Sequence, residues 1–404
     1  MSPSSAVAAD SERRRARALH AHRFLFRLAF SAGNIFAWIF VFRGFFISSG
    51  SLEAALAGVV ALYALSQSIA LFLTPLSGAA LRHGIRRALV YGTFMAVFAF
   101  VCMSLLFVPS PTSGGVIFGL IGSFAILMGI HRALYWIPYQ TADAQGSRGI
   151  GMGQEIAIAC MPFIAGLCIE TSVLGPDALI IAVVALILLS LFPLAMVRES
   201  YERFEWGFSE SFATLFSPFN RGPLWLSIFD GIQGVTLLLI WPIAAFIILG
   251  QSFGALGLVL TITFCATILG RSAFRSILKF LHADRSTSVI ALIAFSSWIF
   301  RLTPVSSIQI ILTDVYYHAG ISPRRFSIDA HVFDQSADGG HYVDEYTALK
   351  EMGMVLGRLV ACASVIFFAI HTSAAIALGS AIILAGFAAA ASVILSRRLA
   401  KRMY

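Results

Sequence analysis

Apolar runs long enough to cross a membrane dominate this sequence. A helix needs roughly 20 apolar residues to span the hydrocarbon core of a bilayer, where its backbone must satisfy its own hydrogen bonds. Only 12% of the residues are charged and 58% are hydrophobic, whereas a typical soluble domain has about 25% charged residues. We therefore expect an all-α polytopic membrane protein. The predicted spans are about 24–48, 53–81, 87–108, 115–140, 151–170, 177–197, 223–249, 254–276, 286–303, 304–320, 345–370 and 373–396.

The positions of Lys and Arg test this set of spans. Cytoplasmic loops carry an excess of both residues. With a cytoplasmic N-terminus, the inner segments hold 23 of the 28 basic residues, and the outer loops SSGSLE, PSPTSGG, TSVLGPD, GQSFG and HTS hold none. The pattern predicts twelve transmembrane helices with cytoplasmic N- and C-termini. Short loops favour a bacterial inner membrane.

The longest polar segments divide the predicted chain into two halves. We expect a basic cytoplasmic N-terminus (1–23), a six-helix bundle (24–197), a cytoplasmic linker (198–222) and a second six-helix bundle (223–404) with a cytoplasmic loop at 320–345. The net charge of +8 follows from the topology and from contact with anionic lipid headgroups. We expect no nucleic-acid partner, and we expect a monomer.

Polar side chains inside the spans mark candidate functional sites, because an ionised group near the bilayer centre costs at least about 2.5–3.5 kcal/mol. In 115–140 they form two adjacent helical stripes with i, i+4 spacing. The candidates are Asn34 and Trp38 in the first span; His131, Arg132, Tyr135, Trp136, Tyr139 and Gln140 in the fourth; Asp230 and Gln233 in the seventh; Asp314, Tyr317 and His318 in the tenth; and Arg358 in the eleventh.

Several of these residues have simpler interpretations. Arg27, Arg43 and Arg301 lie near span ends, and we expect them to extend to the headgroups. For Arg358, a structural pair with Asp314 is as good an interpretation as contact with a solute. The tyrosines and tryptophans are equally consistent with packing.

Three local patterns resemble those of the major facilitator superfamily. The segment SGAALRHGIRRAL is similar to its loop signature, with Ser77 or Gly78 as the small residue, and Leu81 stands where the signature has an acid. Arg132 matches an arginine of many proton-coupled members. MPFIAG (161–166) is a degenerate form of a Gly-Pro-x-x-Gly-Gly pattern of exporters. The residues that match the loop signature, with a role in gating, are Arg82, Gly84, Arg86 and Arg87.

The resemblance implies two six-helix bundles around a central cavity, with alternating access by rocking of one bundle against the other. Spans one, four, seven and ten would line that cavity. These are also the spans that carry most of the candidate residues. The chain is thus expected to be a secondary active transporter of a small organic solute.

Proton coupling is the expected energy source. Burial favours the neutral form of a carboxyl group, so Asp314 or Asp230 could carry a proton, assisted by His131 or His318. Arg132 would bind an anionic solute or act as a counter-charge. The expected partners are a small-molecule substrate, protons and the lipid bilayer, with no cofactor and no metal. MPFIAG favours export.

Two other classes compete with this hypothesis. A membrane-embedded enzyme is disfavoured, because the sequence has no HExxH, phosphate-binding loop, serine elbow or paired-cysteine metal site. A non-transporting or lipid-handling protein of the same fold is the alternative that stays open. Buried charges along a predicted pathway favour transport over it.

Overall fold

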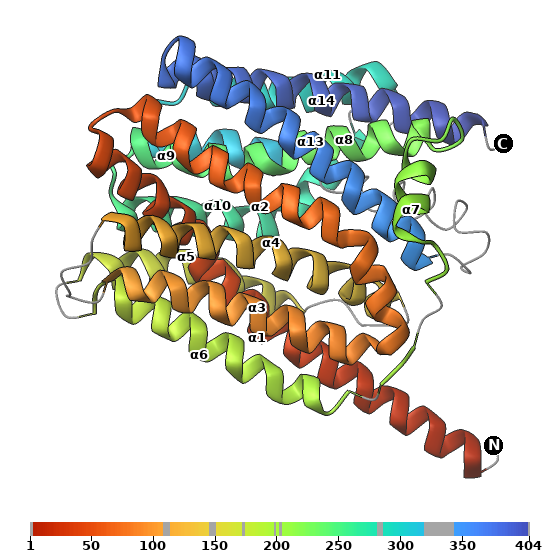
Figure 1. Cartoon of the computed structure of the whole chain (residues 1–404). Helices are drawn as coiled ribbons and strands as arrows, with labels where there is room; N and C mark the ends of the chain where they lie inside the picture. Colours follow the sequence, from red (N-terminus) through yellow and green to blue (C-terminus); the bar gives the residue numbers. More distant parts are fainter. Residues whose placement is uncertain are drawn as a thin grey trace.

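The computed structural model describes residues 3–107, 114–144, 151–171, 174–197, 199–201, 204–280, 286–318 and 343–402. All regular secondary structure within these ranges is helical, and the long helices run side by side (Figure 1). Both termini lie at the same end of the molecule, which we call the termini end (Figure 1). Of the predicted loop 320–345, residues 320–342 lie outside the described ranges.

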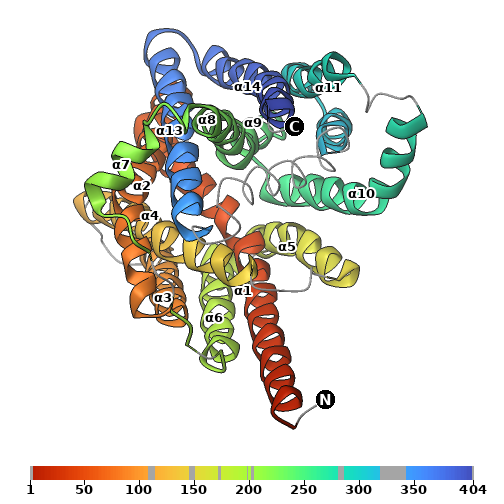
Figure 2. The same cartoon turned by 90° about the vertical axis from the view of Figure 1, so that its right-hand side faces the viewer.

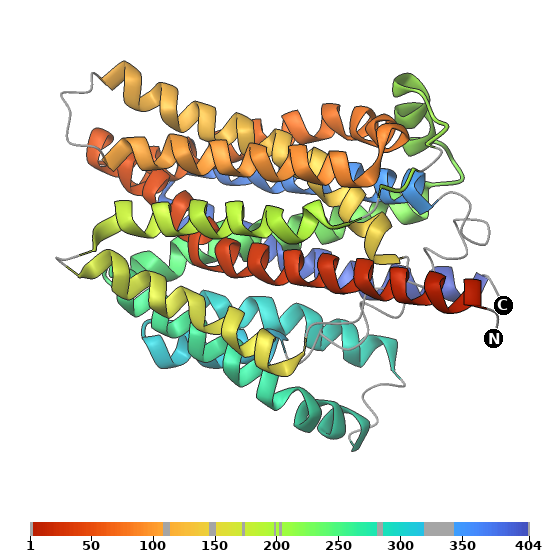
Figure 3. The same cartoon turned by 90° about the horizontal axis from the view of Figure 1, so that it is seen from below.

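The first half of the chain supplies six long helices. They are α1 (Pro3–Ser49), α2 (Leu52–Ala80), α3 (Ile85–Ser104), α4 (Gly114–Ala144), α5 (Met152–Glu170) and α6 (Gly175–Ala195), with 3-10 turns η1 (Leu81–His83) and η2 (Leu105–Phe107). The Ser51 hydroxyl caps α2 by accepting from the amide of Ala54. Helix α1 runs the length of the molecule and projects beyond its neighbours at the termini end (Figure 3).

The second half begins with a short helix in the linker. Its elements are α7 (Phe208–Leu215), α8 (Arg221–Val235), the π-helical turn η3 (Thr236–Ile240), α9 (Trp241–Ile248), α10 (Phe253–Phe280), α11 (Thr287–Ile299), η4 (Phe300–Leu302), helical residues 307–318, α13 (Val343–His371) and α14 (Ala374–Arg402). Helix α8, η3 and α9 form one continuous rod, and the amide of Trp241 bonds to the Thr236 carbonyl across the π-helical turn. Pro242 follows directly, and π-turns of this kind often occur at functional sites.

Ten of the described helices are long and apolar enough to cross a membrane. The chain is therefore an integral, multi-pass membrane protein. The predicted ninth span appears as a shorter apolar stretch, Thr287–Leu302. Of the predicted tenth span, the structure describes a helix only at 307–318. The count of twelve spans and the cytoplasmic position of the termini remain predictions.

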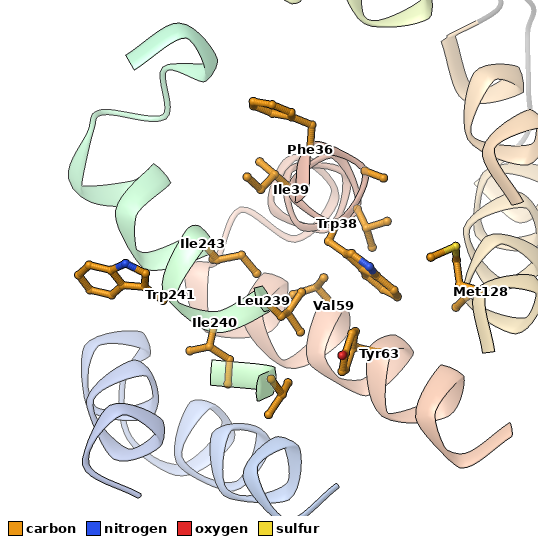
Figure 4. Packing of buried hydrophobic residues seen from close by; sticks show 14 of the residues in the cluster. Phe36, Trp38, Ile39, Val59, Tyr63, Met128, Leu239, Ile240, Trp241 and Ile243 are labelled. Carbon is orange, nitrogen blue, oxygen red and sulfur yellow. The ribbon is translucent and has the colours of Figure 1, made fainter. Parts of the chain in front are cut away.

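The helices gather into two groups (Figure 2). We call α1–α6 the first bundle and α8–α14 the second bundle. Two antiparallel helix pairs dominate the interface between them: α5 against α10, and α2 against α13. Helix α13 also contacts α4. A central part of the interface is apolar, where Leu239 and Ile243 of the second bundle face Val59 and Ile39 of the first (Figure 4).

A proline in α5 creates two further links. Pro162 has no N–H, so the carbonyl of Ile158 lacks its usual helical donor. The Ser31 hydroxyl of α1 donates to that carbonyl at 2.8 Å. One residue later, the Phe163 amide donates to Thr261 Oγ1 of α10 at 3.1 Å. The predicted MPFIAG segment therefore joins α5 to α1 on one side and to the second bundle on the other.

Glycines bring α8 and α13 into backbone contact. A Cβ atom on Gly231 would collide with the Met354 carbonyl, and one on Gly357 would collide with the Ile228 carbonyl. Small residues at such points let membrane helices approach closely. This contact sets the position of α13, which carries the charged residues described below.

Substitution of Gly231 and of Gly234, both on α8, should separate the effect of helix packing on stability from the effect of helix propensity. We expect Gly231→Ala to lower stability by about 1–3 kcal/mol, since the new methyl group must push α13 away. Gly234 is the matched control, because its Cβ would meet nothing within 4 Å. The measurement is the midpoint of thermal unfolding in detergent. Equal midpoints for Gly231→Ala and Gly234→Ala would contradict the close approach.

Candidate functional site

Helix α4 uses its two polar stripes in different ways. The first stripe packs inside the first bundle. His131 Nδ1 lies 2.8 Å from the Gly92 carbonyl of α3. The Tyr135 ring stacks on Phe26 of α1 at a centroid distance of 4.5 Å, and its hydroxyl is 3.0 Å from His22 Nε2. The Tyr139 ring stacks on Tyr135. This stripe therefore joins α4 to α1 and α3.

The second stripe of α4 reaches across to the second bundle. Arg132 Nη2 donates to Glu351 Oε2 of α13 at 3.1 Å. Gln140 Nε2 donates to the other oxygen, Oε1, at 3.3 Å. Glu351 is only 5% exposed. Trp136, between the two polar residues on this stripe, is partly exposed at 37%. The ion pair connects the two bundles through buried charges.

Arg358 adds a second guanidinium at the same interface. It lies on α13 near the middle of the helix and is 4% exposed. Its Nη1 donates to Gln67 Oε1 of α2 at 3.0 Å. The Arg358 Nε is buried and has no acceptor among the described residues, and the same is true of the Arg132 Nε. Both guanidinium groups interact electrostatically with each other and with Glu351.

We call Gln67, Arg132, Gln140, Glu351 and Arg358 the interbundle cluster. Two full positive charges and one negative charge leave it with a net charge of +1. Tyr63 of α2 borders Arg358, and its ring packs edge-to-face against Trp38 of α1 at 5.1 Å (Figure 4). Glu351 lies closer than Arg358 to the start of α13, and hence closer to the termini end (Figure 1).

A second buried ion pair lies within the second bundle. Arg301 donates through Nε and Nη2 to Asp314 Oδ1 at 2.9 and 2.8 Å. Trp241 Nε1 donates to Asp314 Oδ2 at 3.1 Å. The Arg301 guanidinium also lies over the rings of Trp241, Trp298 and Tyr317, at 5.2, 4.5 and 4.2 Å from their centroids. We call these five residues the Arg301 cage.

The Arg301 cage bears on two predictions from the sequence: the position of Arg301 and the partner of Arg358. Arg301 does not extend to the headgroups, because it is 2% exposed and held by Asp314. Arg358 does not pair with Asp314, whose carboxylate is occupied by Arg301 and Trp241. Arg27 and Arg43, in contrast, are both exposed.

The remaining candidate residues are dispersed. Asn34 is half-buried, and its Oδ1 has no hydrogen-bond donor within the described residues. Gln233 is buried and donates to the Phe229 carbonyl of its own helix. Asp230 is half-buried on α8. The His318 ring packs edge-to-face on Phe264 of α10. In the described part of the chain, no three His, Cys, Asp or Glu side chains gather as metal ligands would.

A carboxylate from outside the predicted gating loop, that of Glu199, contacts the basic residues of this loop. Glu199, after α6, accepts from the Arg86 amide at 2.9 Å and from Arg86 Nε at 3.2 Å; it also lies 3.8 Å from Arg87 Nε. A carboxylate is favourable at this position because the first-turn amides of α3 are otherwise unpaired. Gly84 has φ +121°, and a Cβ there would collide with Glu199.

The linker extends this contact to the second bundle. Arg82 Nε donates to the Phe204 carbonyl at 2.6 Å, and the Phe204 ring packs on Gly78. The next amide, that of Glu205, donates to Glu345 Oε1 in the first turn of α13 at 2.8 Å. Phe204 and Glu205 therefore join the loop between α2 and α3 to α13 at the termini end.

The sequence analysis does not predict several polar residues of these networks as site residues, among them Gln67, Glu199, Arg301 and Glu351. A signal exists for Glu351, because it lies seven residues before Arg358 and therefore shares its helical face. Glu199 lies in a linker, where helical periodicity gives no information about partners. Gln67 is flanked by Ser66 and Ser68 in an otherwise apolar span, and no charged neighbour indicates a partner for it.

Comparison with proteins of known structure identifies the fold of this chain. No protein-family model matches the sequence, and no curated protein matches it. Solved structures do match. A peptide transporter POT in complex with sulfate gives a TM-score of 0.60 at 12% identity, over 96% of this chain and 95% of that chain. The E. coli fucose:proton symporter FucP gives 0.53 at 14% identity, over 95% and 98%. A D-xylose-proton symporter gives 0.57 at 16% identity, over 92% and 95%.

This chain has the major facilitator fold. The match spans nearly the whole of each chain, so the likeness is not confined to one bundle. In the major facilitator fold of this chain, the interbundle cluster joins α2 and α4 to α13, and the Arg301 cage lies wholly in the second bundle.

The Arg301 cage should act as a structural lock of the second bundle. We expect Asp314→Asn to lower the free energy of unfolding by about 3–5 kcal/mol, because it leaves a buried guanidinium unpaired. The double variant Asp314→Asn with Arg301→Gln removes both charges and should recover part of that loss. The midpoint of thermal unfolding in detergent measures both. A single variant as stable as the parent would contradict this structural role.

Proposed function

We propose that this protein is a secondary active transporter that moves a small organic solute by alternating access, with coupling to protons. Two of its structural neighbours are named as proton symporters, for fucose and for D-xylose. Their identity to this chain is low, so they support the mechanism class and leave the solute to be argued from the site. The proposal rests on the contacts that the interbundle cluster makes between the two bundles.

The observation behind the proposal is the buried Arg132–Glu351 ion pair, which joins the two bundles. Separation of the bundles on the termini side must break it. An ionised Glu351 opposes that step, because an unpaired carboxylate in an apolar interface is costly. Protonation of Glu351 removes the charge and permits separation. The bundles then separate only when Glu351 is protonated, and this requirement couples the conformational change to proton binding.

Glu351 is better placed for this role than Asp314. Asp314 accepts three hydrogen bonds from Arg301 and Trp241 within a single bundle. Rocking of the bundles need not disturb those contacts. Glu351 accepts from two residues of the opposite bundle. Asp230 remains a second candidate on α8.

The termini end corresponds to the cytoplasmic side in this proposal. The arginines of the gating loop and of the projecting part of α1 favour that side. The Glu199 contacts with Arg86 and the linker contact with Glu345 would then close the cytoplasmic side together with Glu351. The MPFIAG pattern keeps export as the proposed direction.

The alternative is a non-transporting or lipid-handling protein of this fold. It predicts that solutes produce no proton movement and that apolar substitutions at the bundle interface matter more than Glu351. A panel of solutes added to proteoliposomes that contain a pH-sensitive dye tests transport itself. Proton movement with at least one solute supports the proposal. No response to any solute favours the alternative.

Glu351→Gln should uncouple transport from protons. The amide retains hydrogen bonds to Arg132 and Gln140 but cannot release a proton. We expect solute-driven proton movement in proteoliposomes to fall at least tenfold, while exchange of labelled for unlabelled solute persists. The matched control is Glu210→Gln, on the exposed face of α7. Proton movement at the parental rate in Glu351→Gln would refute this role.

A further inference from the structure

The interbundle cluster contains one more positive charge than its own residues neutralise. Glu351 accepts from Arg132 and leaves Arg358 with a neutral partner, the amide oxygen of Gln67. Arg358 is almost completely buried. A buried guanidinium that must share a single carboxylate with a second guanidinium is unfavourable, so its presence requires an explanation beyond stability.

Among the described residues, Arg358 has no second carboxylate as an electrostatic partner. Electrostatic partners of Arg358 are Arg132, Tyr63, Glu351 and Cys362. Within the described residues, Glu351 is the one carboxylate among them, and Lys350 beside it adds a further positive charge. On α2, the one carboxylate is Glu53, which lies in the first turn at the far end of the helix and accepts a hydrogen bond from the Ala374 amide.

Two unused donors point to what would complete the cluster. The Nε groups of Arg358 and Arg132 are buried, and no residue in the described ranges accepts a hydrogen bond from either. They belong to opposite bundles, and their guanidinium groups interact with each other electrostatically. A planar guanidinium binds carboxylate or phosphate oxygens through parallel hydrogen bonds. An oxyanion at this site would therefore satisfy both donors and neutralise the excess charge.

We infer that the transported solute is a small organic oxyanion, and that Arg358, together with Arg132, binds its charged group. This inference rests on the proposed transport function. The anion competes with Glu351 for Arg132, so protonation of Glu351 frees a second guanidinium for the solute. The aromatic ring of Tyr63, which borders Arg358, favours a solute with an apolar body.

Stability of the unliganded protein gives the first test. Arg358→Gln keeps a donor for Gln67 and removes a buried unpaired charge. We expect its midpoint of thermal unfolding to equal or exceed that of the parent, as is common when a binding residue is replaced. A structural arginine would behave in the opposite way. A midpoint several degrees lower for Arg358→Gln would overturn the inference.

Binding gives the second test, on the full chain in detergent. The probes are lactate, succinate, benzoate, phosphate and sulfate, each compared with chloride at equal ionic strength and, for the carboxylates, with the corresponding amide. A ligand that binds the folded state raises the unfolding midpoint. We expect at least one oxyanion to do so and its uncharged amide to have no effect. A response to phosphate or sulfate alone assigns the site to a phosphorylated or sulfated solute rather than a carboxylate.

The matched variants are Arg358→Gln, Arg358→Lys and Arg398→Gln, the last at an exposed arginine near the end of α14. The concentration for a half-maximal shift should rise at least tenfold in Arg358→Gln, less in Arg358→Lys, and not at all in Arg398→Gln. An unchanged response in Arg358→Gln would refute this site.

The outcomes separate this inference from the transport proposal. Proton-coupled transport of an uncharged solute, unaffected by Arg358→Gln, would overturn the anion site and leave the transport function intact. Oxyanion binding that depends on Arg358, with no flux in proteoliposomes, would support the site and contradict transport.

Discussion

Neutralisation of buried charge is the constraint on which this structure depends. Water cannot solvate a guanidinium inside an apolar bundle, so each must find a partner in the protein or in a ligand. Arg301 is neutralised by Asp314 within the second bundle, and three aromatic rings surround the cation. Arg132 is neutralised by Glu351 across the interface between the two bundles. Arg358 is left with a neutral amide. We propose that these three arrangements serve as a structural lock, a gate and a binding residue, respectively.

The helix packing makes these pairings possible. Backbone contact between α8 and α13 fixes the position of Glu351 and Arg358. Ser31 and Thr261 use the polar groups that Pro162 leaves free to hold α5 against α1 and α10. The linker continues the interface at the termini end through Glu199 and Glu345. Most of these polar links are single hydrogen bonds or ion pairs, and such contacts can be exchanged when the bundles move.

Sequence alone predicts the helices well and the partners poorly. Apolar length and the distribution of arginines indicate the spans, because lipid imposes both. The distance of Arg301 from its predicted span end indicates a side chain at the headgroups, and this prediction is wrong. Apolar length carries no information about η4, which turns the Arg301 side chain inward among aromatic rings. Glu351 lies close to the predicted start of its span at 345, so apolar length does not mark it as a site residue. The two adjacent stripes of α4 follow from helical spacing, but their contacts with different bundles do not.

The most direct test of the account is the distance between the bundles at the termini end as a function of protonation. Spin labels at His83, in the gating loop, and at Arg398, on α14, are both on exposed positions; the five native cysteines would be replaced by alanine. Pulsed electron resonance measures the distribution of distances between the labels. If the Arg132–Glu351 pair holds the bundles together, acidification should lengthen the distance in the parent, and Glu351→Gln should show the longer distance at every pH. A distribution that neither pH nor Glu351→Gln alters would contradict the account.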